Sequence, residues 1–297
     1  MSFLKITPQP FIKWAGGKRQ LLPELRKRYE TALRMGCTKY AEPFVGGGAV
    51  LFDITSAHNF EDVYISDINA ELINAYNTIR DNVDILIFEL SNMQNLYVPL
   101  DNKMRIEFYY KMRDEYNSTI ISTNKKDNVR KAVLMMFLNK TCFNGLYRVN
   151  SKGHFNVPIG SYKNPKICDS DNLLAVSKAL RNVRIAHGQF CDSEHFIDEN
   201  TLVYFDPPYK PLNTTSKFTS YTDSGFNDSE QRRLAKYVDR ITNKGAKVMV
   251  SNSDPSDDFF DNLYKKYKVE RVSASRAINS NAKSRGKISE ILVINFD

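Results

Sequence analysis

Seven short apolar segments recur along this chain, and each ends in a polar or glycine-rich turn. Amphipathic patterns of helical period lie between several of them, as at 70–82 and 229–242. Strands that alternate with helices form a mostly parallel sheet covered on both faces. The sequence therefore predicts a doubly wound α/β fold. The expected strands are 40–45, 63–66, 183–186, 202–205, 246–251, 268–272 and 288–294.

One stretch breaks this alternation and indicates an inserted lobe at about residues 90–180. Residues 101–141 have a helical pattern throughout. We therefore expect one α/β domain that is interrupted by a mainly helical lobe. The expected domains are 1–90 together with 180–297, and the lobe at 90–180.

The later part of this lobe has the pattern of a β-hairpin. Asn, Gly, Lys and aromatic residues are frequent at 143–165, and Lys152-Gly153 suits a tight turn. The arms of the hairpin are expected at 146–149 and 155–157.

The charge balance favours a polyanionic partner. The chain of 297 residues has 42 Lys and Arg against 34 Asp and Glu, a formal charge of +8 and a pI near 9.1. Cys37, Cys142, Cys168 and Cys191 lack the spacing of a zinc site or a disulfide framework, so reduced thiols are expected. No apolar run approaches the ~20 residues of a membrane span. We expect a soluble, cytoplasmic protein without a metal site.

Asp206-Pro207-Pro208-Tyr209 follows the apolar segment 202–205 and is the most informative motif for chemistry. The carboxylate can accept a hydrogen bond from an exocyclic N–H, and the prolines fix φ and leave carbonyls without competing amide donors. Tyr209 offers a flat face to a ring. An amine conjugated to that ring attacks a methyl group once it is held in line, without a protein nucleophile. The motif indicates amino-group methylation; the alternative is an ordinary strand-to-loop stop with a locally packed tyrosine.

Gly46-Gly47-Gly48 lies where a strand is expected to turn into a helix, so the backbone there can approach a ligand closely. Roughly 20 residues later Asp67 ends the next expected strand, where an acidic side chain can hydrogen-bond ribose hydroxyls. The alternative is a tight turn with Asp67 as a helix N-cap. The glycines do not fit GxGxxG, and Gly17-Lys18 lacks the Ser or Thr of a P-loop. Recognition of a pyrophosphate is therefore not expected.

The segment 11–18, Phe-Ile-Lys-Trp-Ala-Gly-Gly-Lys, contains the only tryptophan of the chain. One interpretation is a packed N-terminal anchor. In the other, Trp14 lines a cofactor cavity, Lys18 meets the carboxylate of S-adenosylmethionine, and Lys13 points toward DNA. The segment alone leaves both interpretations open.

Together these motifs resemble the Dam family of DNA adenine-N6 methyltransferases, particularly the DpnII-type methylases of GATC-specific restriction-modification systems. The matching segments are 11–18, 43–48, Asp67, 144–150, 155–158 and 206–209, in the family's order. The resemblance covers nearly the whole chain. It implies a Rossmann-like S-adenosylmethionine-dependent methyltransferase sheet, with 90–180 as the target-recognition lobe. It also implies methyl transfer to adenine N6 in double-stranded GATC by base flipping and direct transfer.

The resemblance implies a set of cofactor and catalytic residues. The cofactor contacts are Trp14, Lys18, Phe44, Gly46, Asp67, Phe190 and Asp206. For catalysis, Asp206 and the Pro207 carbonyl hold the target amine, and Tyr209 contacts the flipped base. This chain has Gly188-Gln189-Phe190 where relatives often have Gly-Asp-Phe. An acid that contacts the cofactor is therefore lost, or is replaced by Asp192.

The same resemblance implies DNA contacts within the lobe. Phe143 fills the vacated base step, Asn144 holds the orphaned partner base, and Arg148 reads a guanine edge. The other implied contacts are Leu146 and Pro158 to a thymine methyl group and Lys13 to the outer guanine. Without the family pattern, Phe143 and Leu146 suit a core, and Arg148 suits a phosphate clamp. Ser161 stands where relatives frequently have Arg, so one basic contact is missing.

Several other functions stay open on sequence alone. Cytosine-N4 methylation uses the same chemistry, usually with Ser in place of Asp206, and RNA-adenine or protein-glutamine methylation fits a similar tetrapeptide. A non-catalytic DNA-binding protein would not keep both Asp67 and Asp206. Cytosine-C5 methylation is rejected, because neither Cys142 nor Cys191 follows the proline that precedes its thiolate nucleophile.

The expected partner is double-stranded DNA containing GATC, bound by a monomer. The loop 214–222 follows the catalytic motif and is expected to close over the substrate. The biological setting is left open: protection against a companion restriction endonuclease encoded nearby, chromosome marking, or a mobile element. No stable complex with such a nuclease is expected.

Overall fold

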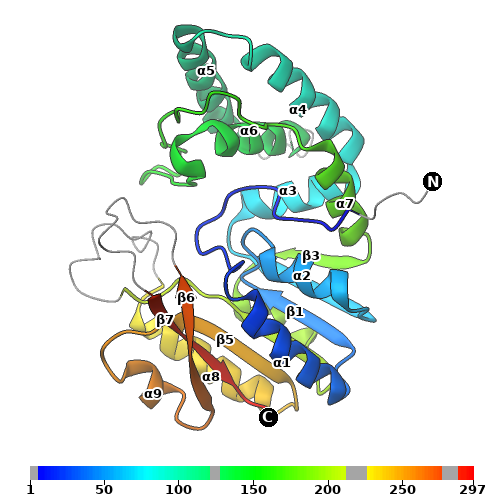
Figure 1. Cartoon of the computed structure of the whole chain (residues 1–297), viewed down its shortest axis with the longest axis vertical. Coiled ribbons are helices and arrows are strands. Elements are labelled where there is room, and N and C mark those ends of the chain that lie inside the picture. Colours follow the sequence, from blue (N-terminus) through cyan, green and yellow to red (C-terminus); the bar gives the residue numbers. More distant parts are fainter. Residues whose placement is uncertain (1–5, 121–127, 212–225, 276–286) are drawn as a thin grey trace. The chain divides into compact units, whose positions relative to one another are not determined.

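The computed structural model describes residues 6–120, 128–211, 226–275 and 287–297 (Figure 1). The chain divides into two compact units. Unit 1 comprises Met1–Gly17, Gly46–Ser56 and Asn69–His187, and unit 2 comprises Lys18–Val45, Ala57–Ile68 and Gly188–Asp297. The expected lid at 214–222 lies outside the described residues. The division into a catalytic domain and a lobe at 90–180 stays a prediction.

A seven-stranded sheet confirms the predicted α/β fold, in the order β3-β2-β1-β4-β5-β7-β6. The strands are β1 (Lys39–Pro43), β2 (Asp62–Asp67), β3 (Val183–His187), β4 (Thr201–Phe205), β5 (Lys247–Ser253), β6 (Lys268–Ser275) and β7 (Lys287–Ile294). β1 pairs in parallel with β2 and β4, and β4 with β5. β7 lies antiparallel between β5 and β6. The connection from β6 to β7, residues 276–286, is shorter than the dozen or so residues that a parallel crossover needs, which accounts for their antiparallel pairing.

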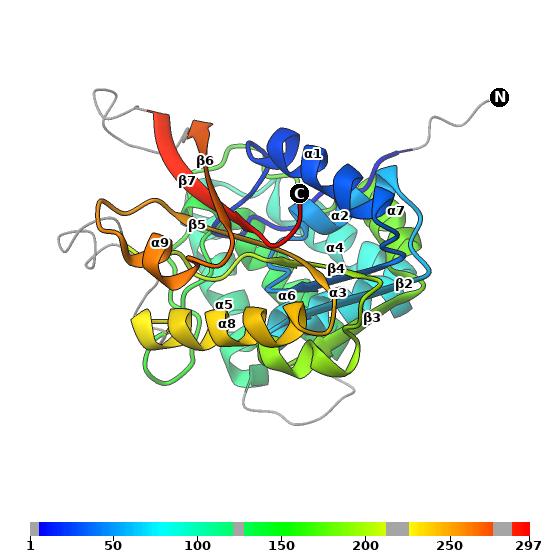
Figure 2. The ribbon, with the colours of Figure 1, turned by 90° about the horizontal axis from the view of Figure 1, so that it is seen from below.

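Unit 2 places helices on both faces of its strands. The helical elements of this unit are α1 (Leu22–Arg34), η3 (Phe190–His195), α8 (Asp228–Thr242) and α9 (Phe259–Leu263). α1 packs against β4 and α8 against β5, from opposite faces of the sheet (Figure 2). Every residue of β4 is buried. The carboxyl end of β4 is therefore held from both sides.

α8 begins at a residue suited to start a helix. The Asn227 side chain accepts hydrogen bonds from the backbone N–H groups of Ser229 and Glu230, at 2.9 and 3.2 Å. Leu234, Val238 and Ile241 lie on its buried face. The predicted helix at 229–242 is thus confirmed, with one extra residue at its start.

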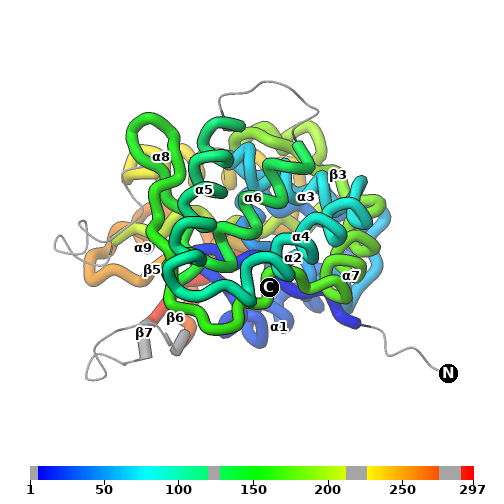
Figure 3. The backbone as a smooth tube through the Cα atoms, turned by 90° about the horizontal axis from the view of Figure 1, so that it is seen from above, coloured from blue at the N-terminus to red at the C-terminus, as the bar shows by residue number. Residues whose placement is uncertain are grey.

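Unit 1 is mainly helical. Its helical elements are α2 (Ala49–Ala57), α3 (Ala70–Asp81), α4 (Val83–Tyr97), α5 (Asn102–Ile120), α6 (Asn128–Thr141), η2 (Phe143–Gly145) and α7 (Ser170–Leu180). α6 is buried from Lys131 to Asn139, because α3, α4 and α5 all pack around it (Figure 3). The predicted helical region at 101–141 is therefore two helices, with 121–127 between them undescribed. No helix of the described part is long and apolar enough to cross a membrane.

The predicted hairpin of unit 1 forms with little regular strand. Its arms meet in one antiparallel bridge between Val149 and Phe155. The Asn150 N–H donates to the His154 carbonyl at 2.9 Å, and the Asn156 N–H to the Arg148 carbonyl at 3.1 Å. Gly153, at the expected tip, has a φ of +78°, which favours glycine.

Candidate active site

Asp206 lies directly after β4, and both of its carboxylate oxygens have hydrogen-bond donors within unit 2. The Lys18 ammonium is 2.8 Å from Oδ2, and the Ser251 hydroxyl donates to Oδ1 at 3.1 Å. The Tyr204 and Ser251 hydroxyls are 2.8 Å apart, so Tyr204 donates to Ser251. The buried strands β4 and β5 thus hold Asp206 through a short chain of hydroxyl groups.

Burial and charge act on Asp206 in opposite directions. The side chains of Lys18 and Asp206 are 7% and 18% exposed. Burial raises the pKa of Asp206 above its ordinary value, while Lys18 and the Ser251 hydrogen bond oppose that rise. The arrangement keeps a hydrogen-bond acceptor in a site with little water.

Tyr209 lies between a cation and a second carboxylate. The Lys18 ammonium is 4.5 Å from the centroid of its ring, and its hydroxyl donates to Glu290 Oε2 at 2.9 Å. Burial, with the negative charges of Asp206 and Glu290, raises the pKa of the Tyr209 hydroxyl well above its usual value. The phenol therefore stays protonated and keeps its hydrogen bond to β7. Sequence reasoning missed Glu290, a buried carboxylate directly before the apolar second half of β7.

An aromatic cluster surrounds Phe44, the residue directly after β1. The rings of Phe44 and Phe190 stack with centroids 5.5 Å apart, and Phe226 meets both rings edge-on. The Arg233 guanidinium lies 4.6 Å from the Phe190 ring centroid. Phe44 has a φ of +117°, unusual for a residue with a side chain, and its N–H donates to the Ser66 carbonyl. Strained backbone of this kind concentrates at functional sites.

Asp67 ends β2 as expected. Its backbone carbonyl accepts a hydrogen bond from the Gly188 N–H at 3.1 Å. Asp192 Oδ2 accepts from the Gln189 N–H at 2.8 Å, which caps the short helix η3. The N-cap of α3 is Asn69, whose side chain accepts from the Leu72 N–H. The alternative interpretation of Asp67 as that cap is wrong.

In unit 1 the glycine turn lies against Trp14. A Cβ atom added to Gly46 would meet the Trp14 ring at 3.0 Å, and one added to Gly47 would lie 3.2 Å from Trp14 Cβ. Gly46 has a φ of +50°, and its carbonyl accepts from the Tyr76 hydroxyl at 3.0 Å. The Trp14 ring also lies 5.3 Å from that of Tyr147. Trp14 therefore packs against the turn, as the anchor interpretation expects, and its place in a cofactor cavity stays a prediction.

One buried amide joins two of the expected DNA-contacting segments in unit 1. Asn139 Oδ1 accepts from the Lys13 N–H at 2.8 Å, and its amide nitrogen donates to the carbonyls of Lys13 and Gly145, each at 2.9 Å. Gly145 is needed there, because an added Cβ would lie 2.4 Å from Lys13 Cδ. Sequence reasoning missed Asn139, although an asparagine at the end of the apolar run 132–138 was a signal for a buried polar role.

The other expected DNA contacts lie nearby in unit 1. Phe143 is 52% exposed, which argues against a core role, and its N–H donates to the Pro158 carbonyl at 2.9 Å. Asn144 has a φ of +55°, and Leu146 is half-buried. Arg148 is exposed, and its Nε donates to Asn156 Oδ1 at 2.8 Å.

The expected site residues thus fall into two groups, one in each unit. Unit 2 holds Lys18, Phe44, Asp67, Phe190, Asp206, Pro207 and Tyr209. Unit 1 holds Trp14, Gly46 and all six expected DNA contacts. Among the described residues, no three His, Cys, Asp or Glu side chains are grouped to hold a metal ion. A carboxylate beside an aromatic ring, at the end of a strand of an α/β sheet, defines a site suited to an amine on a planar ring.

Comparison with known proteins gives the family. The model of the D12 class N6 adenine-specific DNA methyltransferases matches residues 14–278. Type II methyltransferase M.MjaIII of Methanocaldococcus jannaschii is 49% identical over 290 residues, which cover 97% of this chain and 99% of that protein. Type II methyltransferase M1.LlaDCHI of Lactococcus lactis subsp. cremoris is 40% identical, over 98% and 97%. The DNA adenine methylase of Escherichia coli K12 is 33% identical, over 96% and 94%.

The chain belongs to the D12 class N6 adenine-specific DNA methyltransferase family. It is an enzyme that methylates adenine in DNA. The family confirms the resemblance inferred from the motifs, and the cytosine, RNA, protein-glutamine and non-catalytic alternatives are set aside.

Proposed function

We propose that this enzyme transfers a methyl group from S-adenosylmethionine to adenine N6 in double-stranded GATC. The observation that carries the chemistry is the Asp206 carboxylate, fixed by Lys18 and Ser251 at the end of β4 beside Tyr209. The GATC assignment rests on the sequence motifs of the recognition lobe and on the resemblance to the Dam family.

The residues expected to contact the cofactor suit an adenosine linked to an amino acid. In unit 2, Phe44 and Phe190 offer aromatic faces, Asp67 suits ribose hydroxyls, and the Lys18 ammonium suits a carboxylate. In unit 1, the turn at Gly46 lies against the Trp14 ring, which a Cβ atom added to Gly46 would meet at 3.0 Å. When bound, S-adenosylmethionine supplies a methyl group on a positively charged sulfur.

In the proposed reaction, Asp206 and the Pro207 carbonyl accept hydrogen bonds from the two N–H groups of adenine N6. Tyr209 contacts the adenine ring, and its hydrogen bond to Glu290 limits rotation of its own ring. The nitrogen lone pair then attacks the methyl carbon in line, and the bond from that carbon to sulfur breaks. The Asp206 carboxylate stabilises the positive charge that develops on N6, and the extra N6 proton leaves to solvent.

Adenine inside a duplex cannot reach this carboxylate, so we infer that the base is flipped out of the helix, at a cost of a few kcal/mol. Phe143 is exposed enough to fill the vacated step. Asn144 is proposed to hold the orphaned base, Leu146 and Pro158 to meet a thymine methyl group, and Lys13 to reach the outer guanine.

Two relatives are named type II methyltransferases, which favours a role in restriction-modification. We propose that the enzyme acts as a monomer and protects DNA from a companion endonuclease encoded nearby, without forming a stable complex with it.

Expression in a host that lacks GATC methylation tests the proposed function. Plasmid from that host is expected to resist an endonuclease that cuts only unmethylated GATC. The same plasmid should still be cut by an enzyme that cleaves GATC whether or not the adenine is methylated. Full cutting by the first nuclease, with methyl-adenine present elsewhere in the plasmid, would show that the target is a different sequence.

Arg148→Ala is expected to cost about 1–3 kcal/mol of discrimination at one base pair of the site. Asn156 holds the guanidinium through Nε at 2.8 Å and through one terminal nitrogen at 3.4 Å. The remaining N–H groups of both terminal nitrogens can still donate to a guanine edge. The measurement is kcat/KM on GATC duplexes and on duplexes with one altered base pair. Lys152→Ala, at an exposed residue of the same hairpin, serves as the control and should weaken binding uniformly at most. If Arg148→Ala lowers kcat/KM equally on all of these duplexes, Arg148 is a phosphate contact and not a base contact.

A further inference from the structure

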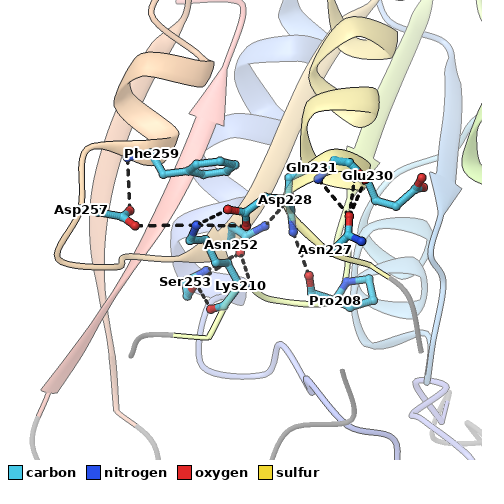
Figure 4. A network of polar contacts seen from close by, with 11 residues as sticks. Pro208, Lys210, Asn227, Asp228, Glu230, Gln231, Asn252, Ser253, Asp257 and Phe259 are labelled. Carbon is cyan, nitrogen blue, oxygen red and sulfur yellow. Dashed lines mark hydrogen bonds and ion pairs between the residues drawn. The ribbon is translucent and has the colours of Figure 1, made fainter. Parts of the chain in front are cut away.

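The backbone around Tyr209 is held by two side-chain amides (Figure 4). Gln231 Nε2 donates to the Pro208 carbonyl at 3.1 Å. Asn252 Nδ2 donates to Gln231 Oε1 at 3.2 Å, and Asn252 Oδ1 accepts from the Lys210 N–H at 3.1 Å. The amide pair therefore joins the peptide groups before and after Tyr209 to each other.

Both amides come from regular elements. Gln231 lies in the first turn of α8, whose start is fixed by the Asn227 cap, and Asn252 lies near the carboxyl end of β5. Each is 1% exposed. A buried amide costs free energy unless it is hydrogen-bonded. Here the partners are the backbone on either side of Tyr209, the other amide and, for Asn252 Oδ1, the neighbouring Ser253 as well.

A second set of contacts holds the residue after Tyr209. The Ser253 hydroxyl donates to the Lys210 carbonyl at 2.6 Å. The Lys210 ammonium lies 2.9 Å from Asp228 and 3.8 Å from the centroid of the Phe259 ring. Figure 4 shows these three side chains. Lys210 thereby ties the motif to the start of α8 and to α9.

These contacts also restrict the position of Tyr209. Tyr209 follows Pro208 directly, so holding the Pro208 carbonyl and the Lys210 N–H limits the position of the tyrosine Cα. Its ring is then set by Glu290 and Lys18. Methyl transfer requires the base and the acceptor carboxylate in near-attack geometry, and a displacement of about 1 Å can cost roughly 10²-fold in rate.

We propose that Gln231 and Asn252 are positioning residues for methyl transfer, which hold Tyr209 at the place where it orients the adenine ring against Asp206. They do not touch the substrate. This inference rests on the proposed role of Asp206 and Tyr209 and goes beyond it by assigning the support of that geometry to α8 and β5.

The test compares Asn252→Ala with Asn295→Ala. Asn295 is a matched amide at the other end of β5: its nitrogen donates to Thr242 Oγ1 and the Ala246 carbonyl, both at 2.8 Å, and its oxygen accepts from the Val248 N–H at 2.7 Å. Both variants are expected to lower the melting temperature. Only Asn252→Ala is expected to lower kcat, by roughly 10²-fold, with the calorimetric Kd for S-adenosylmethionine within about twofold of wild type.

Gln231→Met and Gln231→Glu keep the shape of the side chain and guard against a variant that fails to fold. Met removes both hydrogen bonds, while an ionised Glu removes only the donor to the Pro208 carbonyl. Both are expected to lower kcat more than they change KM, because the effect is on orientation and not on DNA binding. The substrate is unmethylated chromosomal DNA, so the result does not depend on the GATC assignment.

Asp206→Asn is measured in the same assay to separate the two proposals. If Asp206→Asn loses activity while Asn252→Ala, Gln231→Met and Gln231→Glu all keep the wild-type kcat, the positioning role is wrong and the proposed catalytic role stands. If the amide variants lose kcat and Asn295→Ala does not, the positioning role is supported.

Discussion

Asp206→Asn is expected to lower the rate of methyl transfer roughly 10³-fold while the protein stays folded. The substituted amide keeps one oxygen that accepts a hydrogen bond. It lacks the negative charge that stabilises the positive charge developing on adenine N6. The site is largely closed to water, since only 18% of the Asp206 side chain is exposed, so solvent cannot replace that charge.

Single-turnover methyl incorporation into unmethylated DNA measures this loss, and calorimetry with S-adenosylmethionine measures binding, which should be partly retained. The matched control is Asp198→Asn. Asp198 also pairs with a lysine, Lys39, at 2.9 Å, but just before β4 rather than just after it. Its substitution should leave the rate unchanged. A fully active Asp206→Asn enzyme would refute the assigned role.

Lys18→Met is expected to be the most destabilising single change in the site, at about 3 kcal/mol. Removing the ammonium leaves Asp206 as an uncompensated charge in a buried place. Lys39→Met is the control and should cost about 1 kcal/mol or less, because its partner Asp198 is 41% exposed and is stabilised by water. Urea unfolding of both variants gives the comparison.

The loss of stability in Lys18→Met should depend on pH. Burial already raises the pKa of Asp206 in the folded state, and loss of the ammonium raises it further. A carboxyl group with a higher pKa in the folded state destabilises the protein while it is ionised, and this cost fades as pH falls through the raised pKa. The deficit is therefore largest at neutral and alkaline pH and shrinks in acid. A deficit that is independent of pH would point to lost packing of the lysine stem instead.

The double variant Lys18→Met with Asp206→Asn completes the test. It contains neither charge and should recover most of the stability lost in Lys18→Met, because no unpaired ion remains buried. If the losses of stability in the two single variants instead add up to the loss in the double variant, the ion pair contributes no interaction energy of its own. Methyl transfer by the double variant should stay roughly 10³-fold or more below wild type in either case.

Sequence reasoning located the strands and the catalytic motif because their signals are local. Each of the seven expected strands is present, and the Asp-Pro-Pro-Tyr motif lies directly after β4 as its apolar run indicated. The antiparallel place of β7 and the cap at Asn69 were not anticipated, since short apolar runs do not show which neighbour they pair with.

The site was predicted as a set of residues, but not as a set of contacts. Lys18 was assigned to a cofactor carboxylate, and the structure pairs it with Asp206. Glu290, Gln231 and Asn252 carry no motif of their own, so nothing in the sequence connected them with Tyr209. Only their hydrogen bonds reveal that connection.

The sequence by itself determined the order of strands and helices, the glycine turn, and the kind of chemistry that Asp206 and Tyr209 suit. These follow from residue periodicity and from turn residues a few positions apart. The tertiary structure decided which buried charges and amides meet. The physical reason is that parallel pairing of β4 with β5 and the packing of α8 bring Gln231 and Asn252 to the catalytic turn across long sequence separations, where burial makes each unpaired polar group costly.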